Sequence, residues 1–128
     1  MRLLLDTSTF LWATLEDPRL STPAQESLAD PENELFLSPV SAWEIAVKHA
    51  RERLALPEAP AEFVRSRRRA YGIRSLAFDE EAALHVPRLP WLHKDPFDRM
   101  LVCQAIIHQM ALVTNDSLIA QYPVRVVW

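Results

Sequence analysis

The sequence predicts a three-layer α/β/α sandwich, in which helices cover both faces of a mostly parallel central sheet of about five strands. Two observations lead to this prediction. Short apolar runs alternate along the chain with segments that carry helical spacing and helix start signals. The 128 residues, of which 49% are hydrophobic, are also enough to bury one core, and no repeat or glycine-rich linker divides them. We therefore expect one domain over residues 1–128.

The expected strands are short apolar runs. The run at 73–78 alternates between its two faces, as half-buried strands do. Because helical segments separate the runs, the strands should lie mostly parallel. In chain order the expected strands cover residues 2–5, 34–37, 73–78, 111–113 and 124–127.

The expected helices are marked mainly at their ends. A Ser, Thr or Asp followed by proline opens three of them, at 21–23, 38–39 and 95–96, since proline suits the first turn of a helix. Pro60 opens another, which Gly72 is expected to end. In chain order the expected helices cover residues 9–15, 22–30, 40–50, 60–71, 79–86 and 97–110, with one helical turn over 117–121.

The composition excludes several classes of protein. Cys103 is the only cysteine, so no intrachain disulfide can form, which fits the cytoplasm. The apolar run before Asp6 is too short for a signal peptide or a membrane span, so we expect a cytoplasmic protein without membrane contact. Gly72 is the only glycine, which excludes glycine-rich phosphate loops. Any phosphate chemistry must therefore rely on a metal ion or on cationic side chains.

Acidic residues follow the ends of two predicted strands. Asp6 comes directly after the strand at 2–5, and Asp116 follows the strand at 111–113 after two residues. The carboxyl ends of parallel strands meet at one edge of a sheet, where functional sites form. Each residue also has a structural interpretation, because Asp is a favoured helix N-cap and both precede helical segments.

Asp95 and Asp98 lie at the start of the helix over 97–110. Asp95, which precedes Pro96, is expected to cap this helix. Asp98 could form the reciprocal half of a capping box with Asp95, or it could belong to a site at the edge of the sheet.

Glu44 lies inside the helix over 40–50 and also has two interpretations. It could form an exposed ion pair with Lys48, one turn later, which would stabilise the helix by only ~0.2–0.5 kcal/mol. It could instead lie at the edge of the buried stripe, beside Trp43, and point towards the end of the sheet.

Together these five acids indicate a metal site. Carboxylates that converge with few cations nearby repel one another, and a divalent cation removes that penalty. Oxygen ligands favour Mg²⁺ or Mn²⁺, which can activate water for displacement at phosphorus. The net charge of −3 does not contradict a nucleic-acid substrate, because setting these five aside leaves 12 of the 17 acidic residues against 14 basic ones.

Four segments stand out by their order and spacing along nearly the whole chain. They are Leu3-Leu4-Leu5-Asp6-Thr7, Ser41-Ala42-Trp43-Glu44-Ile45-Ala46, His93-Lys94-Asp95-Pro96-Phe97-Asp98-Arg99 and Val113-Thr114-Asn115-Asp116. These segments resemble the PIN-domain family, and within it the VapC-type toxins of bacterial toxin–antitoxin pairs. The sequence departs from relatives at 49–54, which reads His-Ala-Arg-Glu-Arg-Leu instead of a Gly-Lys-Leu-type turn and so alters the neighbouring wall of the expected substrate site.

This resemblance implies an endoribonuclease that depends on Mg²⁺ or Mn²⁺. It implies that the catalytic and metal-binding residues are four acids, with Asp95 as an auxiliary candidate and Thr114 in a supporting polar role. It also implies an RNA substrate, a small antitoxin whose tail blocks the site, and a homodimer. The four acids, called the acidic quartet below, are Asp6, Glu44, Asp98 and Asp116.

Basic residues are further candidates. A cluster on the helix over 60–71 is either a solvated face or a contact for RNA or the antitoxin, since arginine binds phosphate through two parallel hydrogen bonds. Arg99 could neutralise the acids, hold a substrate phosphate or form a structural salt bridge. His93 could act as a base or bind RNA, and the histidines lack the spacing of a zinc site. The basic cluster consists of Arg65, Arg67, Arg68 and Arg69.

Two other functions stay open as alternatives. A catalytically inactive PIN-like module could bind RNA or protein without cutting, although the retained acids argue against it. A phosphoacceptor signalling domain would need an acid pair after the first strand and a lysine after one of the last two strands. Here Asp6 is followed by Thr7, and the only lysines are Lys48 and Lys94.

Overall fold

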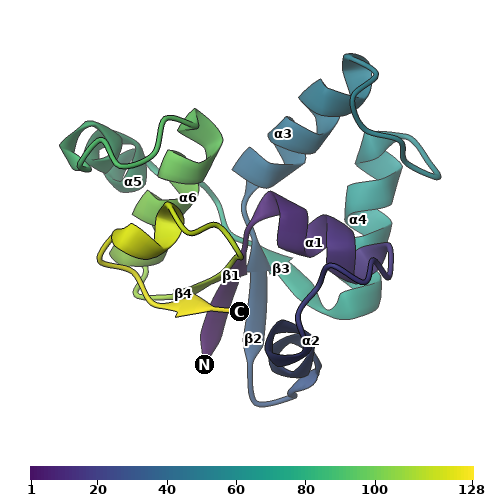
Figure 1. The fold of residues 1–128 in the computed structure, drawn as a ribbon. Helices are drawn as coiled ribbons and strands as arrows, with labels where there is room; N and C mark the ends of the chain where they lie inside the picture. The colour runs from purple at the N-terminus through teal and green to yellow at the C-terminus, as the bar shows by residue number, and fades with distance from the viewer.

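The central sheet contains five strands in the order β3-β2-β1-β4-β5, and every neighbouring pair is parallel (Figure 1). The computed structural model describes residues 1–128. The predicted α/β class and strand number are confirmed, and the sheet is parallel throughout. The strands are β1 (Arg2–Leu5), β2 (Glu34–Leu37), β3 (Ile73–Ser75), β4 (Ala111–Val113) and β5 (Val126–Val127).

The helices begin where the sequence signals predict. Ser21 and Ser38 accept hydrogen bonds from backbone amides in the first turns of their helices, at 3.2 and 3.0 Å. Gly72 ends a helix in the left-handed conformation, with φ of 65°. The helices are α1 (Thr7–Thr14), α2 (Thr22–Ala29), α3 (Pro39–Ala50), α4 (Pro60–Tyr71), α5 (Glu80–His85) and α6 (Pro96–Ile107), with 3₁₀ turns η1 (Val86–Arg88) and η2 (Ile119–Gln121).

Several elements are shorter than predicted, three of them by two residues or more at one end of a strand or long helix. The strand expected over 73–78 ends at Ser75, because the next two carbonyl groups accept hydrogen bonds from the side-chain amide of Gln104, both at 3.2 Å. The helix expected to reach residue 110 ends at Ile107, since Gln109 adopts a left-handed backbone with φ of 53°. The last strand, expected over 124–127, pairs with β4 only at its final two residues.

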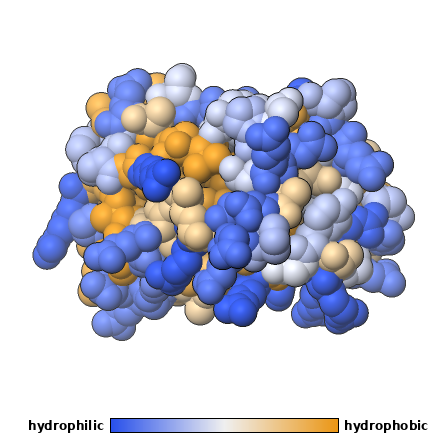
Figure 2. Space-filling view, turned by 90° about the horizontal axis from the view of Figure 1, so that it is seen from below, coloured by the Kyte–Doolittle hydropathy of each residue, from blue (hydrophilic) through white to orange (hydrophobic).

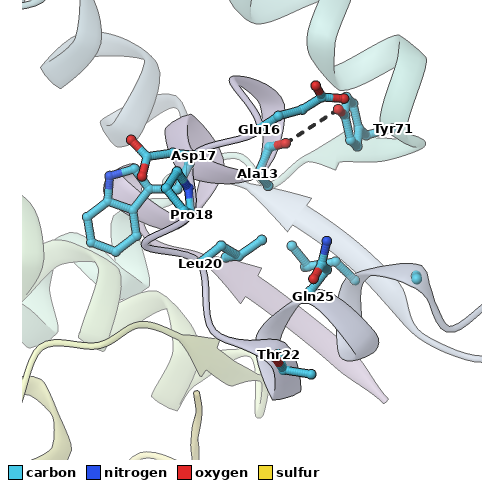
Figure 3. A pocket seen from close by; sticks show the side chains of 11 residues that line it. Ala13, Glu16, Asp17, Pro18, Leu20, Thr22, Gln25 and Tyr71 are labelled. Atoms are coloured by element: carbon cyan, nitrogen blue, oxygen red, sulfur yellow. Dashed lines mark hydrogen bonds between the residues drawn. The ribbon is translucent and has the colours of Figure 1, made fainter.

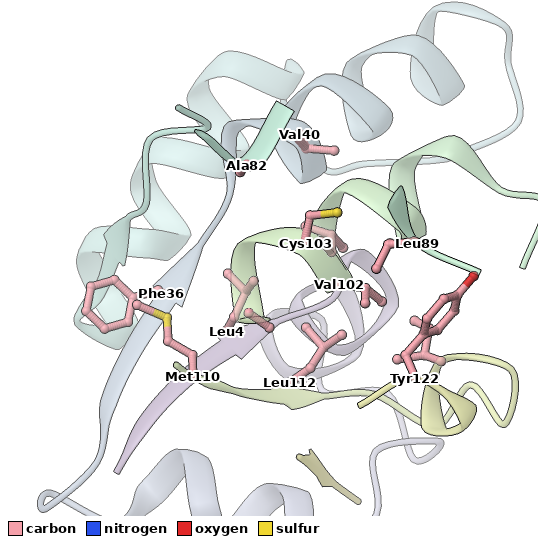
Figure 4. Close-up of a cluster of buried hydrophobic side chains, with 13 residues drawn as sticks. Leu4, Phe36, Val40, Ala82, Leu89, Val102, Cys103, Met110, Leu112 and Tyr122 are labelled. Atoms are coloured by element: carbon pink, nitrogen blue, oxygen red, sulfur yellow. The ribbon is translucent and has the colours of Figure 1, made fainter. Parts of the chain in front are cut away.

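Alternate residues of each strand face opposite layers of the sandwich. Leu4 of β1 packs with residues of α5 and α6 on one face of the sheet (Figure 4). Leu3 and Leu5 pack on the other face with buried residues of α1, α2 and α4, including Phe10 and Phe63. The sheet is therefore covered on both faces, as strands that are apolar on both sides require.

The carboxyl ends of the strands share one edge of the sheet. Leu5 of β1 pairs with Val113 of β4, so the residues that follow these two strands are neighbours. Helix α3 lies across this edge and contacts α1, α4 and α6 (Figure 1). Figure 2 shows the side of the molecule seen from below, which is largely hydrophilic apart from one hydrophobic area. None of the helices has the length and apolar character needed to cross a membrane.

Candidate metal centre

Asp6 caps α1 and also lies at the carboxyl edge of the sheet, in the position that the sequence allows for a site residue. It is 6% exposed and directly follows β1. One carboxylate oxygen caps α1 by accepting a 2.8 Å hydrogen bond from the amide of Thr9. The other oxygen accepts a 2.5 Å hydrogen bond from the hydroxyl of Thr114, which follows β4. Burial raises the pKa of Asp6, and the hydrogen bonds from Thr114 and Thr9 only partly oppose this effect.

Thr114 links the ends of the two central strands. Its side chain is buried, and its hydroxyl oxygen also accepts a 3.1 Å hydrogen bond from the backbone amide of Asp116. One hydroxyl group therefore contacts Asp6 through its proton and fixes the backbone of Asp116 through its oxygen. This geometry agrees with the supporting polar position expected of Thr114.

Glu44 combines the two arrangements that the sequence left open. It is 5% exposed although it lies in α3, and its Oε1 accepts a 2.6 Å hydrogen bond from the hydroxyl of Thr7. Its Oε2 lies 2.5 Å from Nζ of Lys48, one turn later. The ion pair is therefore present, but its carboxylate is buried at the edge of the sheet, where the hydroxyl of Ser41 lies 3.0 Å from that of Thr7.

Asp95 caps α6 as predicted, whereas Asp98 does not complete a capping box. Asp95 accepts hydrogen bonds from the amides of Phe97 and Asp98, at 2.8 and 3.2 Å. The backbone amide of Asp95, which a capping box would pair with Asp98, instead donates to Nδ1 of His93 at 3.0 Å. The carboxylate of Asp98 is therefore free of the cap and lies 3.2 Å from Nε2 of His93.

His93 connects two acids of the quartet. Because its Nδ1 accepts a hydrogen bond from Asp95, the neutral ring carries its proton on Nε2. Nε2 lies 2.8 Å from the carboxylate of Asp116 and 3.2 Å from that of Asp98. The ligand atoms of these three residues all lie within 4.8 Å of one another. The sequence did not predict this contact, because His93 and Asp116 are 23 residues apart in the chain.

The pKa values of the two acids beside His93 are shifted in opposite directions. Burial, followed by the negative charge of Asp95, raises the pKa of Asp98 to about 7, against a lowering by His93. Partial burial also disfavours the charged form of Asp116, which would raise its pKa. Hydrogen bonds from His93 and from the amide of Leu118 outweigh this effect, so the pKa of Asp116 is lowered. The site therefore holds one acid that ionises readily and one that is reluctant to ionise.

The acidic quartet lines one small cavity of about 140 Å³. Its walls contain no hydrophobic side chain, and Lys48 is the only lysine or arginine among them. Few cations lie among these acids, as expected, and the one in the wall, Lys48, contacts Glu44. The lining residues are Asp6, Thr7, Ser8, Glu44, Lys48, Asp95, Asp98, Asn115 and Asp116.

The donor atoms of this cavity fit a hard divalent cation. Five carboxylates line it, and oxygen ligands of this kind are those that Mg²⁺ and Mn²⁺ prefer. Burial and mutual repulsion raise the pKa values of Asp6 and Asp98, and a bound cation would relieve both effects. No cysteine approaches the cavity, so the site lacks the thiolates of many structural zinc sites.

A family model for the PIN domain matches residues 3–124. The chain belongs to the PIN-domain family. PIN domains are, in general, nucleases that use divalent metal ions, and the acidic cavity described above could hold such an ion. A search of curated proteins found no match to the chain.

Solved structures share the fold of this PIN domain at low sequence identity. VapBC2 from Rickettsia felis, bound to a DNA fragment from its promoter, is 17% identical, with a TM-score of 0.71 over 98% of this chain and 97% of that chain. VapBC-1 from nontypeable Haemophilus influenzae is 18% identical, with a TM-score of 0.67 over 98% and 96%. FitAcB from Neisseria gonorrhoeae is 20% identical, with a TM-score of 0.64 over 97% and 95%.

Arg99 does not contact the acids of this PIN domain. It is 3% exposed, and its guanidinium donates hydrogen bonds to the backbone carbonyls of Val86 and Pro90, at 3.0 and 2.9 Å, and to the hydroxyl of Tyr122 at 3.2 Å. The ring of Trp91 covers it at 4.0 Å. Through these contacts Arg99 holds the segment before α6. It does not form the contact with the acids that the sequence left open.

The basic cluster on α4 divides into members with different surroundings. Arg67 lies over the ring of Phe63 at 4.9 Å and contacts Glu58 at 3.5 Å, so its guanidinium is held within the PIN domain. Arg65 and Arg68 line a separate hollow between α3 and α4. The cluster is therefore not a uniform basic face.

A cavity larger than the acidic one lies away from the acidic quartet. It measures about 700 Å³ and lies among α1, α2 and the end of α4, with Leu20, Gln25 and Tyr71 in its walls (Figure 3). The hydroxyl of Tyr71 donates a 3.4 Å hydrogen bond to the carbonyl of Ala13 across one side. It contains no member of the quartet.

Proposed function

We propose that this chain is a metal-dependent endoribonuclease that acts as the toxin of a toxin–antitoxin pair. The observation that carries the proposal is the small polar cavity in which all four acids of the quartet meet, at the carboxyl edge of a parallel sheet. Membership of the PIN-domain family supports nuclease chemistry. The resemblance of the four sequence segments to VapC-type toxins supports RNA as the substrate.

In this proposal Asp6, Asp98 and Asp116 hold Mg²⁺ or Mn²⁺, and Glu44 completes the acidic wall. When bound, the ion would lower the pKa of a water molecule, so that it becomes a nucleophile, and would stabilise negative charge on the phosphate. The protein's own contribution is to hold these carboxylates in place. The hydroxyl of Thr114 fixes Asp6, and Nε2–H of His93 donates to Asp116 and lies 3.2 Å from Asp98.

Two hydrogen-bond donors, one neutral and one charged, hold the carboxylate of Glu44. The hydroxyl of Thr7 donates to one oxygen, while the ammonium of Lys48 contacts the other. The ammonium of Lys48 therefore places a positive charge directly beside this buried carboxylate. Lys48 is also about half exposed, and it lines the cavity, so its charge can contact a substrate phosphate at the same time.

A covalent mechanism through cysteine finds no support in the fold. Cys103 is fully buried in α6, and burial raises the pKa of its thiol to about 11. A protonated and inaccessible thiol is not a nucleophile. Direct hydrolysis at the acidic cavity is the mechanism that we retain.

We further propose an antitoxin partner, a homodimer and a cytoplasmic location. The structures of similar fold include VapBC and FitAB assemblies, two of them bound to DNA fragments, and a toxin–antitoxin complex from Klebsiella pneumoniae. Coexpression tests the antitoxin proposal, because a partner encoded beside this chain should abolish its toxicity in the same cell and copurify with it.

Cleavage of RNA tests the catalytic proposal directly. The purified chain should cut RNA with Mg²⁺ or Mn²⁺ and stop in EDTA, because the acids alone supply no nucleophile. Single substitutions that remove one charge each should abolish cleavage while leaving the apo fold intact. Cleavage undiminished by excess EDTA, or near wild-type rates in these variants, would refute the mechanism. The four variants are Asp6→Asn, Glu44→Gln, Asp98→Asn and Asp116→Asn.

A further inference from the structure

A second hollow opens at the same edge of the sheet as the acidic cavity. It measures about 160 Å³ and lies beyond the carboxyl ends of β2 and β3, between α3 and α4. Its polar walls come from Ser38, Arg65, Arg68 and Ser75, and Ala42 forms part of its apolar floor. The hollow therefore joins two arginines of α4 with one serine at the start of α3 and one at the end of β3.

The two arginines have no acidic partner within the protein. Arg67, between them in sequence, contacts Glu58, but no carboxylate lies within 4.0 Å of the guanidinium of Arg65 or Arg68. Arg65 is exposed and Arg68 is partly buried. Two like charges that share a hollow without an anion repel each other, and an anion bound between them would remove that cost.

The start of α3 adds to the positive potential of the hollow. This helix has 12 residues, and Ser38, its N-cap, lines the hollow together with Pro39. The N-terminal end of a helix carries a partial positive charge that favours anions. Arginine in turn suits phosphate, because its planar group donates two parallel hydrogen bonds.

The hollow lies close enough to the acidic cavity to contact the same nucleic-acid strand. The acidic cavity lies over β1 and β4, and the hollow lies over β2 and β3, in a sheet ordered β3-β2-β1-β4-β5. Two strand spacings separate these positions, or roughly 10 Å. Helix α3 stands between them, with Glu44 facing the acidic cavity and Ala42 facing the hollow.

We propose that this hollow, which we call the Arg65–Arg68 pocket, binds a backbone phosphate of single-stranded RNA beside the bond that the acidic cavity attacks. The proposal rests on RNA being the substrate of the chain. The acidic cavity by itself repels a polyanion when no metal is bound, so a separate cationic pocket would hold the strand in register. Arg67 is excluded from this role by its contacts with Glu58 and Phe63.

The test measures binding of a fluorescent single-stranded RNA oligonucleotide in EDTA, where metal-dependent cleavage does not interfere. The double variant Arg65→Ala/Arg68→Ala should bind at least tenfold more weakly than the wild type. The slope of log affinity against log salt concentration should also decrease, by about 0.7 for each lost phosphate contact. Alanine favours helices, so the variant should remain folded, which circular dichroism checks.

Two further variants act as controls. Arg69→Ala/Arg74→Ala removes the same charge from exposed positions outside the pocket, and its RNA affinity should stay within about twofold of the wild type. Arg65→Lys/Arg68→Lys keeps the charge but loses the paired hydrogen bonds, so its affinity should lie between those of the wild type and the alanine variant.

Several outcomes would overturn the proposal. Equal weakening in the two alanine double variants would show a diffuse charge effect rather than a pocket. Unchanged RNA affinity in Arg65→Ala/Arg68→Ala, with loss of antitoxin binding, would assign the surface to the protein partner. Selective loss of RNA binding in a chain that fails to cleave RNA would support the pocket while refuting the catalytic proposal, so the two failures are distinguishable.

Discussion

Single residues in this protein carry two roles at once, and the sequence revealed only one of them at a time. Asp6 caps α1 and also lines the acidic cavity, so the choice between cap and site was not a real alternative. A capping box with Asp98 was one of two alternatives, but the amide of Asp95 donates to His93 instead. A contact of this kind depends on how a loop folds back, which residue spacing does not encode.

The raised pKa of Asp98 predicts how stability without metal depends on pH. The pKa of Asp98 is about 7 in the folded state, against an ordinary value of 3.8. Between about pH 4 and 7 the folded state therefore binds more protons than the unfolded state. The free energy of unfolding should therefore decrease as pH rises from about 4 to 7 and level off above. Asp98→Asn removes this penalty.

In EDTA, Asp98→Asn should therefore melt at a higher temperature than the wild type at pH 8, and the difference should shrink towards pH 4. Thermal unfolding by circular dichroism measures both values. Asp30→Asn removes an exposed carboxylate away from the cavity and is the control for loss of one negative charge. A difference that is the same at both pH values would show that Asp98 is not protonated in the folded state near neutral pH.

At the scale of elements, helix starts were predictable and element ends were less so. Proline after a capping residue fixed the first turns of α2, α3 and α6 to within a residue or two. The segment expected as strand over 73–78 stopped early because Gln104, from a helix almost thirty residues later, bonds its carbonyls. Long-range side-chain contacts of this kind determine where a strand ends, and the local sequence pattern does not predict them.

Gln104 offers a test of this connection between α6 and the end of β3. Its amide is buried and donates to the carbonyls of Leu76 and Ala77. Gln104→Met keeps a similar volume but leaves both carbonyls without this donor, so the free energy of unfolding should decrease by about 1–3 kcal/mol. Urea unfolding measures the loss, and Gln25→Met, at an exposed position, is the matched control. Equal stability of the two variants would show that other contacts hold the segment.

At the scale of the whole molecule, the parallel sheet was predictable from the alternation of strands and helices, and the sheet then brought the acids together. Asp6 and Asp116 meet because β1 and β4 are neighbours, an order that the sequence alone did not provide. Resemblance to the PIN-domain family supplied the grouping of the quartet in advance. The division of the basic cluster into Arg67 and the Arg65–Arg68 pocket needed side-chain contacts from the fold.

Binding of a divalent ion should stabilise the whole molecule, because the unfolded chain does not hold the acids together. At a concentration one hundred times the dissociation constant, the stabilisation is about 2.7 kcal/mol. Adding Mg²⁺ or Mn²⁺ should therefore raise the melting temperature of the wild type. Asp98→Asn and Asp116→Asn should lose most of this increase, whereas Asp30→Asn should keep it. An equal increase in all the variants would place the bound ion elsewhere.

The hydrogen bond between Thr114 and Asp6 joins residues that are 108 positions apart, at opposite ends of the chain. During translation, Asp6 and Glu44 are synthesised well before the segment that contains Thr114 and Asp116. The acidic cavity can therefore form only after the chain has been synthesised through Asp116 and β4 has joined β1. If the chain cuts RNA as we propose, a nascent chain that has not reached Asp116 is inactive, whatever the state of the segments made before it.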